Sequence, residues 1–248
     1  MSPRVLRPTL LLLASLLVAL PLAAQRTAAP YVPGKHPAWD RRAPAQVGMD
    51  AALLDSAIAF AVASESRTPR DLLEAHWLSF GREPHGAPIG PFAPRGDQAG
   101  LVIRNGYVVA AWGDLDRVDM TFSVTKSFLS TTIGLAFDRG LIPDLHEPVR
   151  RFVTTGEFDS EHNRRITWDH LLRQTSDWQG TLWDKPDWAD RPSNPLAEYV
   201  ARQRAEPGTT YKYNDVRVNL LAYAGLMVWR RPLPQVLREY VMDPIGAS

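Results

Sequence analysis

Phe122-Ser123-Val124-Thr125-Lys126-Ser127-Phe128 is the stretch that decides how this 248-residue chain is interpreted. It places a serine hydroxyl and a lysine amine three residues apart, in an S-x-x-K pattern, at the start of an apolar segment. Residues three apart share one face of a helix. A lysine one turn away can take the proton of a serine that is otherwise a poor nucleophile. The alternative is an ordinary helix start, with Ser123 as N-cap and Lys126 in solvent.

The segment that follows Ser123 predicts a helix that runs as far as Gly140. Its residues are apolar on nearly every side, so we expect this helix to be buried in the centre of the domain. A serine at the N-terminus of such a helix has a rigid mount, and the helix dipole favours a developing anion there.

The chain around this helix predicts a mixture of helices and strands. Asn105-Gly106 lies between two strand-like runs, 101–104 and 107–112, which is a strong hairpin signal. Asp50 precedes an amphipathic helix with Leu53, Leu54, Ala57, Ile58, Ala61 and Val62 as its apolar stripe. The stretch 81–99, rich in proline and glycine, predicts an irregular loop, and another helix is expected from about Val216 to Val228.

Residues 1–24 have the pattern of a secretory signal peptide: two arginines, a leucine-rich run and small residues before Gln25. A membrane anchor is disfavoured by Pro21 and the polar segment after it, so no stable anchor is expected after cleavage. We therefore predict an exported protein, periplasmic or secreted, with an extended leader over 25–49. The chain has no cysteine, which excludes disulfides, and its net charge of +1 indicates no nucleic-acid partner.

Four ordered segments carry a family resemblance. They are the Asn105-Gly106 hairpin followed by 122–128, the turn 140–149, the stretch Ile166-Thr167-Trp168-Asp169-His170-Leu171-Leu172-Arg173-Gln174-Thr175-Ser176, and Pro207-Gly208-Thr209-Thr210-Tyr211-Lys212-Tyr213-Asn214-Asp215. In this order the set resembles the serine β-lactamase and penicillin-binding-protein superfamily. The most similar branch contains class C β-lactamases, D,D-carboxypeptidases, carboxylesterases and 6-aminohexanoate-dimer hydrolases.

The resemblance implies an α/β (α+β) fold of the β-lactamase/transpeptidase type, with an antiparallel sheet and a helical subdomain at about 141–207. It covers residues 50–248. It implies Ser123 as the acylating nucleophile, Lys126 as its proton partner and Tyr213 as a proton shuttle. The chemistry agrees, because a phenol beside an ammonium can share one proton. For Tyr213 the alternative is a core tyrosine with its hydroxyl at the surface.

Two departures from the family pattern modify this expectation. Asp215 stands where the family has asparagine; a carboxylate accepts but cannot donate a hydrogen bond, and it should hold Lys126 charged. Asn214 is a candidate to replace the missing amide. The third family motif, K-T-G or H-x-G, and the strands of the sheet's middle do not occur before Ser248. We thus expect the N-terminal part of a longer enzyme, with the 248-residue chain inactive by itself.

Other candidates are weaker. Trp178 and Trp183 lie between the first and second motifs and could either form an aromatic substrate wall or pack against the subdomain. The six histidines have no metal-ligand spacing, and His170 is expected to be structural. No metal or cofactor is expected.

The sequence predicts a serine hydrolase that cleaves a small ester, amide or peptide through an acyl-enzyme on Ser123. The alternatives are a β-lactamase or D,D-peptidase, and a non-catalytic exported binding protein on the same fold.

Overall fold

The computed structural model describes residues 31–35, 39–192 and 195–247, so the predicted signal peptide lies outside the described residues. The helices are α1 (Ala51–Ala63), α2 (Leu72–Phe80), α3 (Thr125–Asp138), α4 (Trp168–Leu172), α5 (Leu196–Ala201), α6 (Asp215–Trp229), α7 (Leu233–Leu237) and α8 (Asp243–Ile245). The strands are β1 (Gly100–Arg104), β2 (Tyr107–Trp112), β3 (Thr181–Leu182) and β4 (Lys185–Pro186). Short helical turns are η1 (Pro44–Val47), η2 (Phe122–Val124), η3 (Val149–Arg151), η4 (Asn163–Arg165), η5 (Asp187–Ala189) and η6 (Arg238–Met242).

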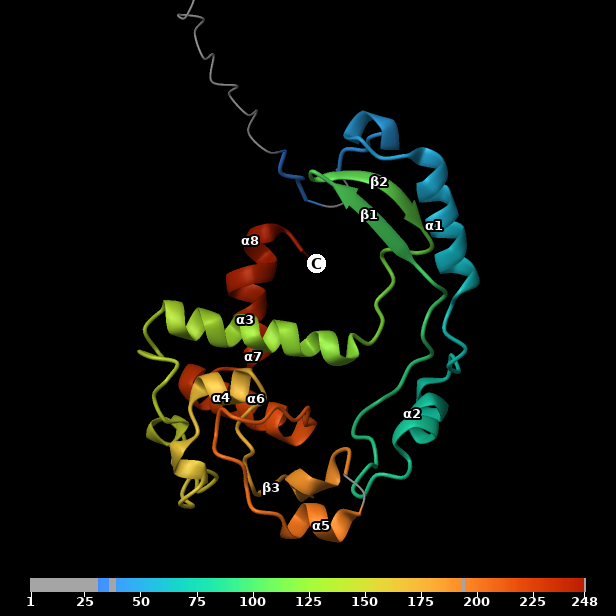
Figure 1. Cartoon of the computed structure of the whole chain (residues 1–248). Helices are drawn as coiled ribbons and strands as arrows, with labels where there is room; N and C mark the ends of the chain where they lie inside the picture. Colours follow the sequence, from blue (N-terminus) through green and yellow to red (C-terminus); the bar gives the residue numbers. More distant parts are fainter. Residues whose placement is uncertain (1–30, 36–38, 193–194, 248) are drawn as a thin grey trace, which may run out of the picture.

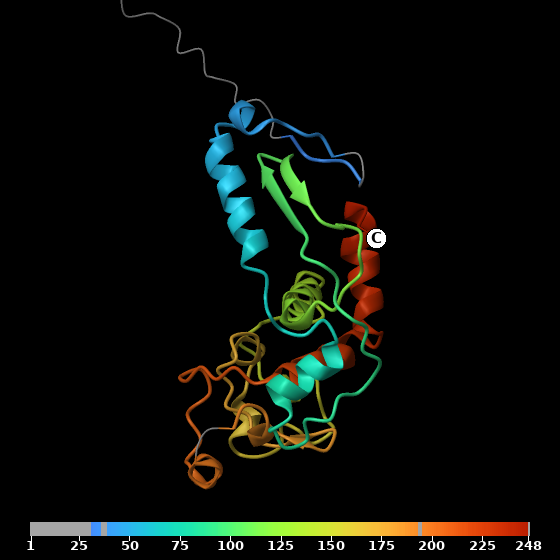
Figure 2. The same cartoon turned by 90° about the vertical axis from the view of Figure 1, so that its right-hand side faces the viewer.

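Helix α3 crosses the middle of the molecule (Figures 1 and 2). The hairpin β1–β2 and helix α1 lie on one side of it, and α4 and α6 lie on the other (Figure 1). Helix α3 packs against α6 and α7, and α4 packs against α6. Helix α2 lies beyond the N-terminal end of α3, so it borders the region that contains Ser123 (Figure 1).

The predicted hairpin is confirmed. Strands β1 and β2 pair in antiparallel register, with Arg104 opposite Tyr107. Asn105 and Gly106 have φ of 53° and 85°, the left-handed geometry that a two-residue turn between twisted strands requires.

The described part of the predicted leader contains the helical turn η1, and the residues before that turn are attached to the hairpin. Arg42 N–H donates to the Val108 carbonyl and Val108 N–H donates to the Asp40 carbonyl, both at 3.0 Å. The ring of Tyr31 stacks on Tyr107 with centroids 4.3 Å apart. The leader therefore runs along β2 over these residues.

Helix α1 begins where the sequence predicts, with the Asp50 carboxylate accepting a hydrogen bond from Leu53 N–H at 3.0 Å. Its apolar stripe, however, is largely uncovered. Of its residues only Leu54 is buried, while Phe60 is 74% exposed and Leu53 70% exposed. Among the described residues the sheet beside α1 has two strands only, which is too little surface to cover the stripe.

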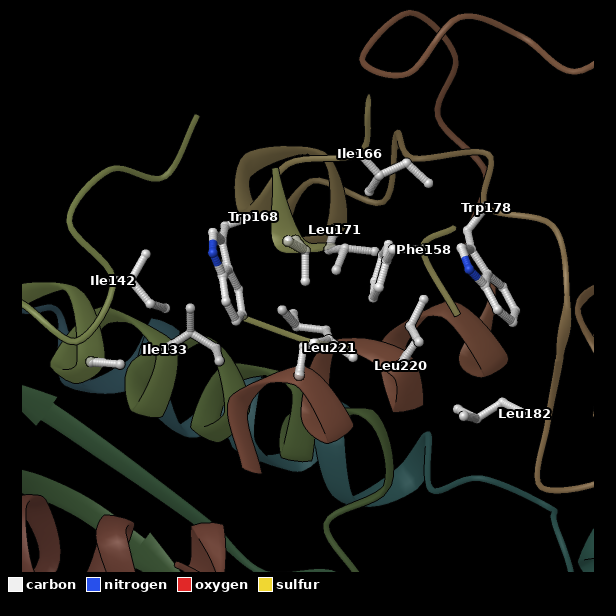
Figure 3. Packing of buried hydrophobic residues seen from close by; sticks show 14 of the residues in the cluster. Ile133, Ile142, Phe158, Ile166, Trp168, Leu171, Trp178, Leu182, Leu220 and Leu221 are labelled. Carbon is white, nitrogen blue, oxygen red and sulfur yellow. The ribbon is translucent and has the colours of Figure 1, made fainter. Parts of the chain in front are cut away.

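The hydrophobic core lies between α3, α4 and α6 (Figure 3). Ile133 and Ala136 of α3 face Trp168 and Leu171 of α4 and residues of α6, of which Leu220 is fully buried. The range 141–207 supplies the remaining large core side chains, which are Ile142, Val149, Val153, Phe158, Ile166, Trp178 and Leu182. The predicted helical subdomain therefore shares one core with α3 and α6, and its own helices, α4 and α5, are short.

The expectation that α3 is buried all round is wrong. Thr132, Ile133 and Ala136 are its only buried residues, and Phe137 is 42% exposed. The face of α3 away from α6 has no described element packed closely on it, which leaves that face open. Within the described ranges no helix is both long and apolar enough to cross a bilayer.

A group of mostly buried ion pairs contacts the first turn of α6 through Arg217, and we call it the buried ion cluster. It consists of Asp177, Asp187, Arg202, Arg204 and Arg217. Arg217 Nη2 lies 2.9 Å from Asp177 Oδ1 and 3.0 Å from Asp187 Oδ2, and its side chain is 2% exposed. Burial raises the pKa of the Asp177 carboxyl, but Arg202, the Ala205 amide and Arg217 outweigh it and lower the pKa to about 2.

Candidate active site

Ser123 lies in the turn η2, immediately before α3, and its hydroxyl faces two partners. Phe122 adopts φ of 46°, a left-handed conformation that costs a bulky residue free energy and persists only when the surroundings hold it. Ser123 is not the N-cap of α3, since the cap position is Val124 and no side chain caps it. The simple helix-start interpretation of Ser123 is therefore wrong.

Three side chains predicted from the sequence meet at one point. Ser123 Oγ lies 2.6 Å from the hydroxyl of Tyr213. Lys126 Nζ donates to Ser123 Oγ at 3.2 Å and also lies 4.8 Å from the centroid of the Tyr213 ring. Tyr213 is 90 residues away in sequence, so the fold, not local spacing, brings its hydroxyl to the serine. Both partners are within the reach that proton transfer requires.

Gln174 holds the segment that carries Tyr213. The Gln174 carbonyl accepts from Lys212 N–H at 3.0 Å, and its side-chain Oε1 accepts from Asn214 N–H at 2.8 Å. Gln174 has φ of 55°, and in this conformation its carbonyl and its side chain both accept hydrogen bonds from the segment that contains Tyr213. Gly208 N–H also donates to the Thr175 carbonyl at 2.8 Å. Gln174 thus holds the backbone on both sides of Tyr213, at Lys212 and at Asn214.

Lys126 forms an ion pair with Asp215, with Nζ 2.7 Å from Oδ1. Partial burial lowers the pKa of Lys126, but Asp215 and the Tyr213 hydroxyl raise it by more, so the net pKa is above the ordinary lysine value. Burial likewise raises the pKa of the Asp215 carboxyl, while Lys126 and Arg191 together bring it below the ordinary value. The direction for Lys126 agrees with the expectation from the sequence.

Arg191 and Asp190 are site residues that the sequence did not reveal. Arg191 Nη1 lies 3.0 Å from Asp215 Oδ2 and 3.0 Å from each carboxylate oxygen of Asp190. Asp190 is buried, and its Oδ2 accepts from Asp215 N–H at 2.7 Å. No motif surrounds these two residues, so only the folded loop reveals them. We call Lys126, Asp190, Arg191 and Asp215 the nucleophile network.

Asn214 does not replace the missing amide. It is fully buried, its Oδ1 accepts from Arg217 N–H at 3.0 Å, and its Nδ2 donates to the Asp187 carbonyl at 2.7 Å. It therefore caps α6 and joins that helix to the buried ion cluster, and the expected contact with a substrate is wrong.

The two tryptophans have different environments. Trp178 is 1% exposed, and its Nε1–H donates to the Glu157 carbonyl at 2.7 Å, so the packing alternative is correct for it. Trp183 is 67% exposed and lines the same cavity as Ser123. Trp183 and Asp184 form the turn between β3 and β4 with φ of 47° and 63°. Only Trp183 can contribute to a substrate wall.

The cavity beside Ser123 has a volume of about 1210 Å³. Ser123, Lys126 and Asp215 line it, together with the apolar side chains of Phe80, Ile89, Phe92, Met120, Phe122 and Trp183. Apolar walls with a few convergent polar groups are typical of small-molecule sites. In the described ranges no group of three histidine, aspartate or glutamate side chains could hold a metal ion.

His170 has a local structural function, as expected. Thr167 N–H donates to His170 Nδ1 at 3.2 Å, and His170 N–H donates back to Thr167 Oγ1 at 3.3 Å, which closes a capping box at the start of α4. Burial lowers the pKa of His170, which favours the neutral ring that accepts this bond.

Comparisons with solved structures give distant similarities. An octameric penicillin-binding protein homologue from Pyrococcus abyssi is 22% identical with a TM-score of 0.36, and the alignment covers 50% of this chain and 30% of that one. A D-stereospecific amidohydrolase from Streptomyces sp. is 21% identical with a TM-score of 0.38, covering 49% of this chain and 40% of that one. A protein of Bacteroides dorei DSM 17855, assigned provisionally as a beta-lactamase, is 18% identical with a TM-score of 0.49, covering 80% and 52%.

The chain therefore spans about half or less of the length of these structures. No curated protein sequence matches it. The model of the Beta-lactamase family matches residues 95–248, which include the hairpin, the S-x-x-K segment and Tyr213. Because this match extends over more than half of the chain and includes the groups that meet at Ser123, the chain belongs to the Beta-lactamase family.

Proposed function

We propose that this chain is part of an exported serine hydrolase that cleaves an ester or amide bond through an acyl-enzyme on Ser123. The observation that carries the proposal is the contact of one serine oxygen with two proton partners, Tyr213 at 2.6 Å and Lys126 at 3.2 Å. An exposed serine with only a structural function could bond to water and would need neither partner. The predicted signal peptide, residues 1–24, supports export.

The proposed reaction has two steps. Ser123 passes its hydroxyl proton to the Tyr213–Lys126 pair while Oγ bonds to the carbonyl carbon of the substrate. The bond to the leaving group then breaks, and the pair returns the proton to the departing alcohol or amine. Water repeats the sequence: it gives a proton to the pair, attacks the ester on Ser123 and releases the acid, and Ser123 regains its proton. The backbone N–H of Ser123 donates one hydrogen bond to the oxyanion.

The substrate we propose is a small ester with an apolar acyl or leaving group. The apolar side chains around the cavity, among them Phe80, Phe92 and Trp183, favour such a group. Asp215 disfavours penicillins, because an ionised carboxylate cannot donate to their side-chain amide whereas an asparagine could. An ester lacks that requirement.

Labelling with a fluorophosphonate probe tests the proposal on the full-length protein. We expect one adduct, and mass spectrometry should place it on the peptide that contains Ser123. Ser123→Ala should abolish both the adduct and the turnover of a p-nitrophenyl ester. Ser127→Ala is the matched control, because Ser127 is an exposed serine in the first turn of α3, four residues after Ser123.

Each outcome separates the alternatives. Labelling that survives Ser123→Ala would exclude Ser123 as the nucleophile. A folded protein with neither labelling nor turnover would favour the non-catalytic binding protein. A cephalosporin with a higher kcat/KM than the ester would favour a β-lactamase or D,D-peptidase.

A further inference from the structure

Asp215 binds two cations at once, and this arrangement has a consequence for the lysine. Its Oδ1 lies 2.7 Å from Lys126 Nζ, and its Oδ2 lies 3.0 Å from Arg191 Nη1. A carboxylate that faced Lys126 alone would hold the lysine proton with its full charge. A second cation on the same carboxylate opposes that attraction.

Arg191 is fixed from several directions. Its side chain contacts Asp190, which is 3% exposed, and its backbone N–H donates to Glu83 Oε1 at 3.2 Å. Its carbonyl accepts from Lys212 Nζ at 3.0 Å. Arg191 adopts φ of 46°, a left-handed conformation that costs free energy and persists only when the surroundings impose it. The contacts of the backbone and the guanidinium together account for that conformation.

The guanidinium also covers the second proton partner of Ser123. Arg191 Cζ lies 4.6 Å from the centroid of the Tyr213 ring, and Lys126 Nζ lies 4.8 Å from the same centroid. Arg191 thereby touches both Asp215 and Tyr213. Through these two contacts Arg191 can influence Ser123 indirectly.

The charges of the nucleophile network balance, with two carboxylates against one ammonium and one guanidinium. Lys126 is faced by Asp215 of α6 and by Tyr213 of the preceding segment, and Arg191 is faced by Asp190 and Asp215. Glu83, after α2, is the remaining acid near Arg191, and it lies 3.9 Å from Lys185 Nζ. Without Arg191 the nucleophile network would contain two carboxylates and one ammonium.

We propose that Arg191 is a positioning residue of the acylation step: it shares Asp215 with Lys126 and so weakens the hold of that carboxylate on the lysine proton. This inference rests on the function proposed above. Its consequence is that the Tyr213–Lys126 pair releases its first proton at a lower pH than it would beside an unshared carboxylate.

The test is the pH dependence of acylation in the full-length protein, measured as kcat/KM for p-nitrophenyl acetate. We expect Arg191→Gln to move the rising limb of the plot of kcat/KM against pH to higher pH by about one unit, which is about a tenfold loss of rate on that limb. Asp215→Asn should move the limb the opposite way. In the Asp215→Asn background, Arg191→Gln should have a much smaller effect on the limb, because the shared carboxylate is gone.

Two controls make the result specific. Arg150→Gln removes the same charge from an exposed position and should leave the limb unchanged. If Arg191→Gln lacks a cooperative unfolding transition, Arg191→Lys carries the test: its ammonium can stay beside buried Asp190 but is too short to reach Asp215 as well. The limb should then move in the same direction by a smaller amount.

The failures of the two proposals are distinguishable. Absence of fluorophosphonate labelling in the unchanged protein contradicts the proposed function. The assignment of Arg191 is overturned if Ser123 is labelled normally and the rising limb of the pH profile of Arg191→Gln, or of Arg191→Lys, coincides with that of the unchanged protein. An equal shift in the Asp215→Asn background also overturns it, because the effect would then bypass the carboxylate.

Discussion

The buried ion cluster and the nucleophile network both pair two aspartates with basic side chains, but their central groups differ in exposure. At the centre of the cluster the side chains of Asp177, Asp187 and Arg217 are 2–4% exposed, while the outer Arg202 is 31% exposed. In the network Asp190 is also buried, but Lys126 is 24% and Asp215 38% exposed. All cations of the cluster are arginines, which do not lose a proton in proteins, whereas the network contains a lysine, which can. Similar ion pairs therefore fix the scaffold in one region and are open to proton exchange in the other.

Removing Lys126 is expected to have the largest effect on the reaction and almost none on the fold. Lys126→Ala should lower the acylation rate by about 10²–10⁴, the range for a lost proton-transfer group. The melting temperature should change little, since a half-exposed ion pair contributes about 0–1 kcal/mol. Ester kinetics and thermal unfolding check both expectations. Lys185→Ala, which removes a lysine from the same cavity, is the control, and a loss equal to that of Lys126→Ala would contradict the prediction.

Removing Arg217 should have the reverse signature. Arg217→Met leaves Asp177 paired with Arg202 and Asp187 paired with Arg204, but it removes the one cation that contacts both carboxylates in the interior. The loss of these buried charged hydrogen bonds should lower the free energy of unfolding by about 1–3 kcal/mol. Below its transition temperature the folded variant should still label at Ser123. Urea unfolding measures the change, with the exposed Arg150→Met as the comparison. A loss below about 1 kcal/mol would show that the cluster is not the scaffold we describe.

The cluster should also give the protein a pH dependence of stability at low pH. The pKa of Asp177 is lowered to about 2 from 3.8, so its contribution is present above pH 3.8 and is lost as the pH falls through about 2. That contribution is about 2 kcal/mol. Urea unfolding between about pH 5 and pH 2 should show the loss. Asp177→Asn should be less stable at pH 5 and should lack this part of the slope; an unchanged slope would contradict the assignment.

The smallest expected effect concerns substrate choice. Asp215→Asn replaces an acceptor by a group that also donates, and it removes one negative charge beside Lys126. At a pH above the rising limb we expect acylation by a cephalosporin to rise about tenfold, the value of one added hydrogen bond, while ester turnover at the same pH changes less. Kinetics on both substrates decide the matter. A fall of cephalosporin acylation would show that Asp215 does not stand in for an amide.

The sequence predicted the elements whose signals are local. Asn105-Gly106 specifies the hairpin turn by its backbone geometry, and Asp50 specifies the start of α1 by capping. The family resemblance also singled out Ser123, Lys126 and Tyr213, whose side chains meet at the hydroxyl of Ser123 in the structure.

The sequence could not predict what depends on the path of a loop. Asp190 and Arg191 lie in a stretch without periodicity, and their placement depends on the left-handed backbone of Arg191 and on its contacts with Glu83 and Lys212. The sequence also does not predict burial along α1 and α3, because an apolar pattern shows which surface should be covered and not which element covers it. Leu53 on α1 and Phe137 on α3 are exposed for that reason.

The pinned ends of the segment between Thr175 and Gly208 have a consequence for how this enzyme family can diversify. The segment leaves and returns at a single point, where Gly208 N–H bonds to the Thr175 carbonyl, and Gln174 holds the backbone around Tyr213. Within the segment Asp190 and Arg191 are bonded to Asp215, whereas the turn between β3 and β4 carries the exposed Trp183. Length changes in an exposed turn with fixed ends cost little free energy. Insertions in the turn between β3 and β4 can thus remodel the wall of the cavity near Trp183 while Tyr213 and Arg191 stay in place.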